Sequence, residues 1–367
     1  MYFYICLILL TFSLIESLFK YEIDIKRILL IFSLALFFIL IAFNTWSPDL
    51  DSYKFQYENY DEQYVRYSVE PLTLLIIKYA NMFGFAFEQY QIFIASVIAF
   101  LLYKSLIRYS PLPIFVLSCF YFIPFYPDIV QLRSFLSYTI LIYALGFSND
   151  QKIKFWLLFG LALLTHYSIL IFLPFIFLKR FSFFNSVKKN HYIILISLLV
   201  LLLIPKSISE PIITFVNPKY KLLLDEKNTF LGTLVLFMPF YCINSFVLNF
   251  NEKRYKYIEH KIDKKYKKHI PLLIQLIQYS NYTILFQYFI RDVSRITYLL
   301  YLADLVYLSI ILFYGVSRRY SKEKVTFLRV STVLWAILIF YVNFLMINGG
   351  EYFKVIEKVF NSNSVLR

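Results

Sequence analysis

The sequence predicts an all-α, polytopic integral membrane protein with roughly 11–13 transmembrane or half-spanning helices. Hydrophobic residues make up 60% of the 367 residues and charged residues only 16%, a balance that a soluble domain of this length could not bury. Several apolar runs reach the ~20 residues that cross about 30 Å of hydrocarbon. The expected spans are about 2–19, 28–45, 90–107, 111–127, 133–148, 155–178, 191–205, 229–250, 271–290, 296–316 and 326–347. No linker separates them, so we expect one transmembrane domain over residues 1–367.

Basic residues outnumber acidic ones and give the chain a formal net charge of +14. They lie in short loops between apolar segments, where they set the orientation of membrane helices, so nucleic acid is not an expected partner. The three cysteines, Cys6, Cys119 and Cys242, lie in apolar runs without a C-x-x-C or histidine pairing. This pattern favours packing over a disulfide or a metal site. No metal or cofactor is expected.

The basic loops also predict which side of the membrane each segment faces. Residues 20–27, 251–269 and 318–324 are rich in lysine and arginine, and 251–269 alone carries eight basic and three acidic residues. Cytoplasmic loops carry such an excess, so we expect these three segments inside and residues 46–71 on the opposite, extracytoplasmic side. Residues 71–84 are short for a span and are expected to re-enter from the outer face or to lie along it.

Residues 46–71 are an acidic, polar interruption in a basic and very apolar chain. Five tyrosines in this segment follow one another at spacings of four and three, which predicts one helical stripe. They are Tyr53, Tyr57, Tyr60, Tyr64 and Tyr67. We expect an amphipathic helix on the outer face, with the tyrosine rings in the headgroup belt or against sugar rings.

The acidic residues at the two ends of this segment have several interpretations. Asp49-Leu50-Asp51 has the form of the D-x-D motif of nucleotide-sugar transferases, but the chain lacks the α/β domain that presents this motif to a metal. Asp51 or Ser52 is instead expected to cap the tyrosine helix. Glu70-Pro71 has the form of a second cap, followed by proline at the first helical position. Capping and a functional role are compatible at these positions.

Residues 155–178 have basic residues before and after them, and one straight membrane helix cannot place both ends on the cytoplasmic side. We therefore expect a break near Thr165-His166 and a return of the chain as two short helices. A single span with one basic end on the outer side is the alternative. His166 lies in an otherwise apolar run and is either a packing histidine or a site residue at this break.

With this orientation, polar residues from distant segments converge at the outer face. Ionisable groups there are costly unless they are paired, hydrated or part of a site. Arg133 opens an apolar helix and is a helix-end charge, a salt-bridge partner of Asp128, or a clamp for a diphosphate or carboxylate group. Arg291 and Arg295 stand four residues apart, on one helical face, and are either interfacial charges or part of the same cation site.

The order of these motifs resembles the EpsG-like branch of Wzy-type bacterial polysaccharide polymerases. The matching elements are Asp51, Tyr53 and Tyr57 in PDLDSYKFQY, Glu70 in VEPLTLLIIKY, Arg133 in VQLRSFLSYTI, His166 in LALLTHYSILIFLPF, and Arg291 with Arg295 near Tyr298. Ser134 follows Arg133 where glutamine is common in the family. The resemblance covers most of the chain in sequence order.

The resemblance implies a multi-pass protein of the bacterial cytoplasmic (inner) membrane that builds O-antigen-type or capsule-type polysaccharide. It implies a metal-independent glycosyltransferase that polymerises undecaprenyl-diphosphate-linked oligosaccharide repeat units, its donor and acceptor, at the periplasmic or outer face. Membrane lipid, a flippase and a chain-length regulator are the other implied partners. The chemistry needs cations at the diphosphate and a base near the acceptor hydroxyl. The catalytic candidates are His166, Arg133, Arg291, Arg295 and Glu70, and the substrate-binding candidates are Asp49, Asp51, Tyr53, Tyr57, Asp128 and Tyr298.

The sequence is also compatible with two other functions. A transporter or flippase of lipid-linked glycan also needs charged cavity residues, although the matched halves that transporters often show are not seen in this sequence. A ligase that adds a single glycan would give one product size, whereas a polymerase gives a ladder of sizes.

Overall fold

A computed structural model gives the structure of the chain and describes residues 2–18, 23–122, 131–148, 150–178, 196, 241–242, 244–248, 255–286, 293–315, 322–340 and 351–365. Within these residues the regular structure is helical apart from one isolated bridge between Asn44 and Asn363, which confirms the all-α prediction. The chain divides into two compact units, Met1–Leu170 with Tyr320–Arg367, and Ile171–Arg319. The single-domain interpretation stays a prediction.

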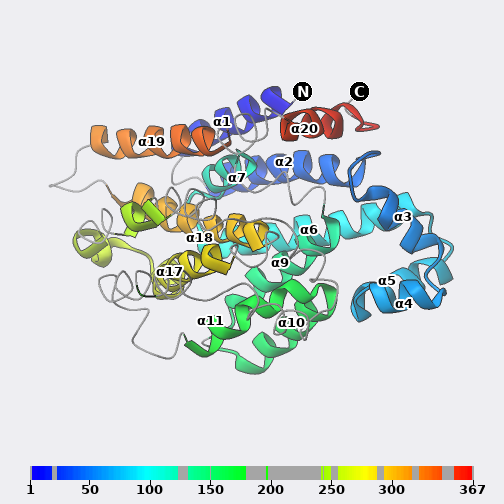
Figure 1. Cartoon of the computed structure of the whole chain (residues 1–367). Coiled ribbons are helices and arrows are strands. Elements are labelled where there is room, and N and C mark those ends of the chain that lie inside the picture. The colour runs from blue at the N-terminus through cyan, green and yellow to red at the C-terminus, as the bar shows by residue number, and fades with distance from the viewer. Residues whose placement is uncertain are drawn as a thin grey trace. The chain divides into compact units, whose positions relative to one another are not determined.

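Helices occupy the predicted spans wherever those spans are described (Figure 1). They are α1 (Tyr2–Leu18), α2 (Ile23–Ala42), α6 (Phe87–Tyr109), α7 (Pro113–Phe122), α9 (Leu132–Leu145), α10 (Lys152–Thr165), α17 (Ile270–Phe286), α18 (Val293–Tyr314) and α19 (Lys322–Phe340). Among the described residues, α2 and α6 are the two helices long and apolar enough to cross a membrane. The expected spans 191–205 and 229–250 lie almost entirely outside the described residues.

The pair of α2 and α6 forms the centre of the first unit, and its contacts show that the two helices run antiparallel. At one end, the Gln91 side chain of α6 donates to the Ile41 carbonyl, near the end of α2, at 2.7 Å. At the other end, Lys26 of α2 donates to the Pro111 carbonyl, just beyond α6, at 3.3 Å. The basic start of α2 therefore lies beside the end of α6, and segment 46–71 leaves from the opposite end of the pair.

Apolar and aromatic packing surrounds this pair. Helices α1 and α7 pack on α2, α9 packs against both α6 and α10, and α19 packs on α7. Phe37 of α2 and Tyr121 of α7 meet edge to face with their ring centroids 5.5 Å apart, a favourable aromatic geometry. Phe120 and Phe135 stack in the same core, 6.4 Å apart. This packing holds α9, which carries Arg133, against the rest of the unit.

The acidic segment forms two helices and not the single predicted tyrosine helix. Helix α3 covers Leu50–Glu58, α4 covers Gln63–Ser68, and a turn separates them. Because the turn interrupts the helical phase, the tyrosines do not form one continuous stripe. The N-cap of α3 is Asp49, which makes no side-chain capping hydrogen bond, so the expected cap by Asp51 or Ser52 is wrong.

Helix α5 (Pro71–Met82) follows and ends at a glycine-dependent turn. Its 12 residues rise by about 18 Å, too little to cross about 30 Å of hydrocarbon, as expected from the sequence. Gly84 adopts a φ of 72°, and its amide bonds back to the Asn81 carbonyl at 2.9 Å. The turn exposes the Phe85 carbonyl, which accepts a hydrogen bond from the Tyr57 hydroxyl at 2.6 Å. Helix α3 is thus attached to the turn between α5 and α6.

The predicted break near Thr165-His166 is confirmed. Helix α10 ends at Thr165, His166 has extended backbone angles, and the chain continues as a 3-10 helix, η1 (Tyr167–Phe172), and then as α11 (Leu173–Leu178). The Thr165 carbonyl, left without a helical donor by the break, accepts a hydrogen bond from the Thr73 hydroxyl of α5 at 3.0 Å. The return of the chain toward the cytoplasmic side after the break stays a prediction.

The C-terminal segment contains a helix that the sequence analysis did not expect. Helix α20 covers Glu351–Asn361, after the last expected span, 326–347. The residues after it bond to the end of α2, because the Asn363 side chain donates to the Ile39 carbonyl at 2.9 Å and the Thr45 hydroxyl donates to the Ser362 carbonyl. These contacts fix α20 beside the start of segment 46–71.

In the second unit, α17 and α18 pack against each other. A buried polar group lies beside α17, where the Asn244 amide donates to Ser280 at 2.6 Å and to Asn281 at 2.8 Å. Tyr279 packs on Phe175 of α11, with the ring centroids 5.2 Å apart. Residues 255–269 carry the short helices η3 (Glu259–Lys261) and α16 (Lys264–Lys267); their cytoplasmic position stays a prediction.

Candidate active site

Glu70 is the residue around which the site is built. It occupies the N-cap position of α5, with extended backbone angles, but its side chain makes no capping hydrogen bond. Its Oε2 instead accepts a hydrogen bond from Nη1 of Arg133, on α9, at 2.9 Å. The carboxylate still benefits from the positive end of the α5 dipole. Glu70 therefore occupies the predicted N-cap position, and its side chain connects α5 to α9.

Arg133 lies in the first turn of α9, between the carboxylate of Glu70 and an aromatic ring. Its guanidinium carbon stands 5.2 Å from the ring centroid of Tyr53, on α3, within the range of a cation–π contact. Burial raises the pKa of the Tyr53 phenol to about 12, although the positive charge of Arg133 opposes this shift. Tyr53 is therefore neutral at physiological pH, and its ring supports the cation.

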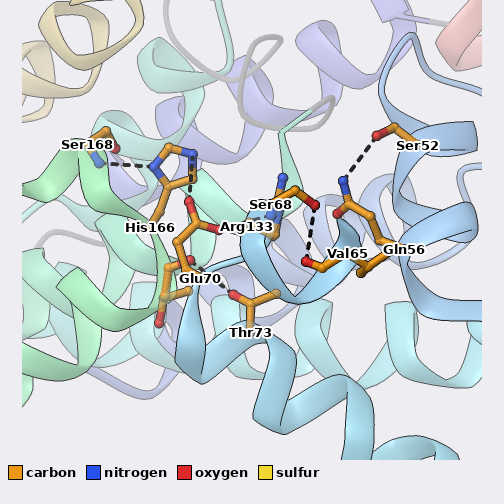
Figure 2. A network of polar contacts seen from close by, with 10 residues as sticks. Ser52, Gln56, Val65, Ser68, Glu70, Thr73, Arg133, His166 and Ser168 are labelled. Atoms are coloured by element: carbon orange, nitrogen blue, oxygen red, sulfur yellow. Dashed lines mark hydrogen bonds and ion pairs between the residues drawn. The ribbon is translucent and has the colours of Figure 1, made fainter. Parts of the chain in front are cut away.

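His166 completes the cluster from the break after α10. Its Nε2 lies 3.9 Å from Oε1 of Glu70, and its Nδ1 accepts a hydrogen bond from the backbone amide of Ser168 at 3.1 Å (Figure 2). The Ser168 hydroxyl is in turn 3.1 Å from the Tyr138 hydroxyl of α9. Glu70 thus lies between Arg133 and His166, with one carboxylate oxygen toward each.

The three charged or titratable side chains are sheltered from solvent to different degrees. The exposed fraction of the side chain is 9% for Glu70, 18% for Arg133 and 26% for His166. The charges of an ion pair at this depth are screened by solvent much less than those of a surface pair. The Arg133 side chain nevertheless remains in part exposed to solvent. An anionic group can therefore reach Arg133 without unfolding the site.

The structure brings together Glu70, Arg133, His166 and Tyr53 of the predicted site residues. Arg133 pairs with Glu70, while its predicted alternative partner Asp128 lies outside the described residues. The functional roles of these four side chains stay predictions.

The other candidates from segment 46–71 lie around this cluster. Tyr57 is buried against the rings of Phe87 and Tyr90, so its contacts are those of a packing residue. Asp49 acts on the Tyr53 phenol through its charge, and Asp51 is exposed on α3.

The side chains of the remaining candidates lie outside the described part of the chain. Arg291 lies outside the described residues. Arg295 and Tyr298 belong to the first turns of α18 in the second unit, and their side chains are outside the described set. Within the described part of the chain, no group of three or more His, Cys, Asp or Glu side chains is arranged to hold a metal ion.

Four residues that support the site or the core were not singled out from the sequence. Thr73 lies one helical turn after Glu70, a spacing that places both on one face of α5 and that could have identified it. The backbone amide of Ser168 has no sequence signal. Glu16 and Asp304 are single acidic residues in apolar helices, a pattern that marks an important position, and both are fully buried.

The all-helical fold and the ionisable cluster between apolar helices define a helical membrane protein with an internal polar site. The family model of the EpsG family matches residues 26–356, nearly the whole chain. The chain therefore belongs to the EpsG family, and the predicted resemblance is confirmed. No match was found among curated proteins or among solved structures. Family membership indicates a membrane protein of polysaccharide biosynthesis.

Proposed function

We propose that the protein is a glycosyltransferase that polymerises lipid-linked oligosaccharide repeat units at the outer face of the bacterial cytoplasmic membrane. The donor is a growing glycan on undecaprenyl diphosphate, and the acceptor is a sugar hydroxyl of the next lipid-linked unit. The observation that carries the proposal is the cluster of Arg133, Glu70 and His166, supported by Tyr53. It combines a cation for the diphosphate leaving group with two groups able to handle a proton.

The direction of the helix pair α2–α6 supports an outer-face site. Lys26, Arg27 and Arg108 lie toward the same end of the pair, because Lys26 bonds to the carbonyl of Pro111 just after α6. Basic residues favour the cytoplasmic side. Segment 46–71 leaves from the other end, and it carries Tyr53 and leads into Glu70.

A second basic group is consistent with this orientation. Arg108 donates to the Tyr143 carbonyl at 3.3 Å, and Lys154 lies 4.0 Å from the ring centroid of Phe147, in the connection between α9 and α10. Gly146 allows this approach, since a Cβ there would lie 2.3 Å from Nη1 of Arg108. Helix α9 carries Arg133 in its first turn and ends near these residues, so the site and the basic group lie at opposite ends of α9.

The size of the products made on purified lipid-linked repeat units tests the proposal. The wild-type chain should give a ladder, and Arg133→Ala should leave single repeat units. An Asp61→Asn variant, which alters the exposed ion pair between Asp61 and Arg66, should give the wild-type ladder. A single product size from the wild-type chain would favour a ligase. Transfer of the intact substrate across vesicles without any joining would favour the alternative, a transporter or flippase of lipid-linked glycan.

A further inference from the structure

The two oxygens of the Glu70 carboxylate have different partners, and only one of them is strongly bound. Oε2 is engaged by Arg133 at 2.9 Å, while Oε1 is 3.9 Å from Nε2 of His166, longer than a hydrogen bond. Both partners are side chains that stem from other elements, α9 and the residue after α10. Glu70 is thus held by groups that can rotate away, and its backbone position does not depend on them.

The contacts of His166 decide what its ring can do. Because Nδ1 accepts the amide hydrogen of Ser168, the neutral ring carries its own hydrogen on Nε2. That hydrogen faces Oε1 of Glu70. A second proton could enter only at Nδ1, against the Ser168 amide. His166 is therefore arranged to donate a hydrogen bond to Glu70 and not to accept a proton from a substrate.

Arg133 retains binding capacity beyond its contact with Glu70. Its Nε is buried and, among the described residues, has no hydrogen-bond partner. The Tyr53 ring holds the guanidinium in place from one side. A diphosphate offers several anionic oxygens in the geometry that a guanidinium binds best, and it carries more charge than one carboxylate. It can therefore replace Glu70 on Arg133.

We propose that Glu70 is the base that takes the proton of the acceptor hydroxyl, and that Arg133 restrains it until the diphosphate of the donor displaces it. This inference rests on the proposed function. While paired, the Oε2 oxygen of Glu70 is occupied by the Arg133 guanidinium and cannot approach the acceptor hydroxyl. Once displaced, it can move toward Nε2 of His166, 3.9 Å from its Oε1, which then donates a hydrogen bond to it, and its other oxygen is free to accept a proton. Base activation is thereby coupled to donor binding.

The transfer step balances without any further reactant. The acceptor oxygen forms a bond to the anomeric carbon of the donor glycan as the bond from that carbon to the diphosphate oxygen breaks. The electron pair of the broken bond goes to the undecaprenyl diphosphate leaving group, which Arg133 stabilises. The hydroxyl proton goes to Glu70 and passes to water when the products leave. Arg133 and Glu70 then pair again.

Equilibrium binding of undecaprenyl diphosphate to the purified full chain in detergent tests the exchange. Glu70→Gln removes the charge that competes for Arg133 while keeping the side-chain shape, so we expect about tenfold tighter binding and a loss of polymerisation of about 10²-fold or more. Arg133→Gln should lose binding, and Asp61→Asn should match the wild-type chain. Binding by Glu70→Gln that is equal to or weaker than wild type overturns the exchange.

The outcomes separate this inference from the proposed function. If the wild-type chain binds no undecaprenyl diphosphate, both fail together. If it binds and polymerises, but Glu70→Gln binds no tighter, only the exchange fails. If Glu70→Gln polymerises at the wild-type rate, Glu70 is not the base.

Two variants at position 166 test its positioning role. The amide nitrogen of His166→Gln can reach the place of Nε2 and donate to Glu70, so this variant should retain far more activity than His166→Ala. If His166 itself were the base, neither Gln nor Ala at this position could take over its role. Equal inactivity of both variants, with folding and diphosphate binding intact, would therefore contradict the assignment of the base to Glu70.

Discussion

Glu16 and Glu70 are both buried carboxylates in the first unit, and they differ in the kind of donor that satisfies them. Glu16, in α1, accepts hydrogen bonds from the backbone amides of Ile114 and Phe115 at 3.1 and 2.9 Å, at the start of α7. Glu70 is held by side chains, Arg133 and His166. The backbone donors at the start of a helix can leave Glu16 for a ligand only if the helix unwinds. Side-chain donors such as Arg133 can rotate from Glu70 toward a ligand. The first arrangement stabilises the fold, and the second can exchange with a substrate.

The largest contrast is expected between the glutamine variants of these two residues. Glu70→Gln should lower polymerisation per folded molecule by about 10²-fold to 10⁴-fold and change stability little, because Gln can still accept from Arg133. Glu16→Gln should lower the free energy of unfolding by about 1.5–3 kcal/mol, because the amide nitrogen that replaces one carboxylate oxygen cannot accept the backbone hydrogen facing it. Per folded molecule, its activity should be unchanged. Product gels with thermal unfolding in detergent measure both, and the reverse pattern would contradict the comparison.

Arg133→Ala should cost the most stability at the site itself. It leaves Glu70 buried without its cation, a change that costs about 3–5 kcal/mol for a buried pair. The double variant Glu70→Ala with Arg133→Ala should recover part of this loss but no polymerisation, since the unpaired charge is gone and the diphosphate site is gone with it. Removing Asp61 from its exposed pair with Arg66 should change stability little. Additive effects of the two site variants in a double-mutant cycle would show that the pair is not coupled.

The contribution of Tyr53 is expected to be smaller. Tyr53→Phe keeps the ring beneath Arg133, whereas Tyr53→Leu removes it and should cost roughly 0.5–2 kcal/mol of stability. Diphosphate binding should weaken in Tyr53→Leu by less than in Arg133→Gln, since the cation remains and only its support is lost. Thermal unfolding and binding of the two Tyr53 variants provide the check. Equal losses in the Phe and Leu variants would assign the role to the hydroxyl and not to the ring.

The sequence was sufficient for the helical fold and for most members of the cluster. Hydropathy located the helices, and the basic ends of 155–178 predicted the break before His166. The sequence alone could not identify Arg133 as the partner of Glu70. The two residues are separated by 63 positions and meet only through the packing of α9 against α6 and α10.

The incorrect predictions have local physical causes. The tyrosine spacing predicted one helix, but the turn between α3 and α4 ends the first helix at Glu58. The amphipathic helix α20 was missed because its 11 residues, four of them charged, are too short and too polar to be recognised as a membrane span. The donor from Ser168 to His166 is a backbone amide, for which side-chain identity gives no signal.

The stabilisation of the protein by undecaprenyl diphosphate tests the central claim most directly. A ligand that binds the folded state raises the unfolding temperature, and at a fixed ligand concentration the shift is larger when the affinity is higher, so comparing variants reports which residues hold the diphosphate. With saturating ligand, we predict a clear upward shift for the wild-type chain, a larger one for Glu70→Gln and none for Arg133→Gln. An Arg133→Gln protein that is stabilised as much as the wild-type chain would show that the diphosphate does not bind at the Glu70–Arg133 pair.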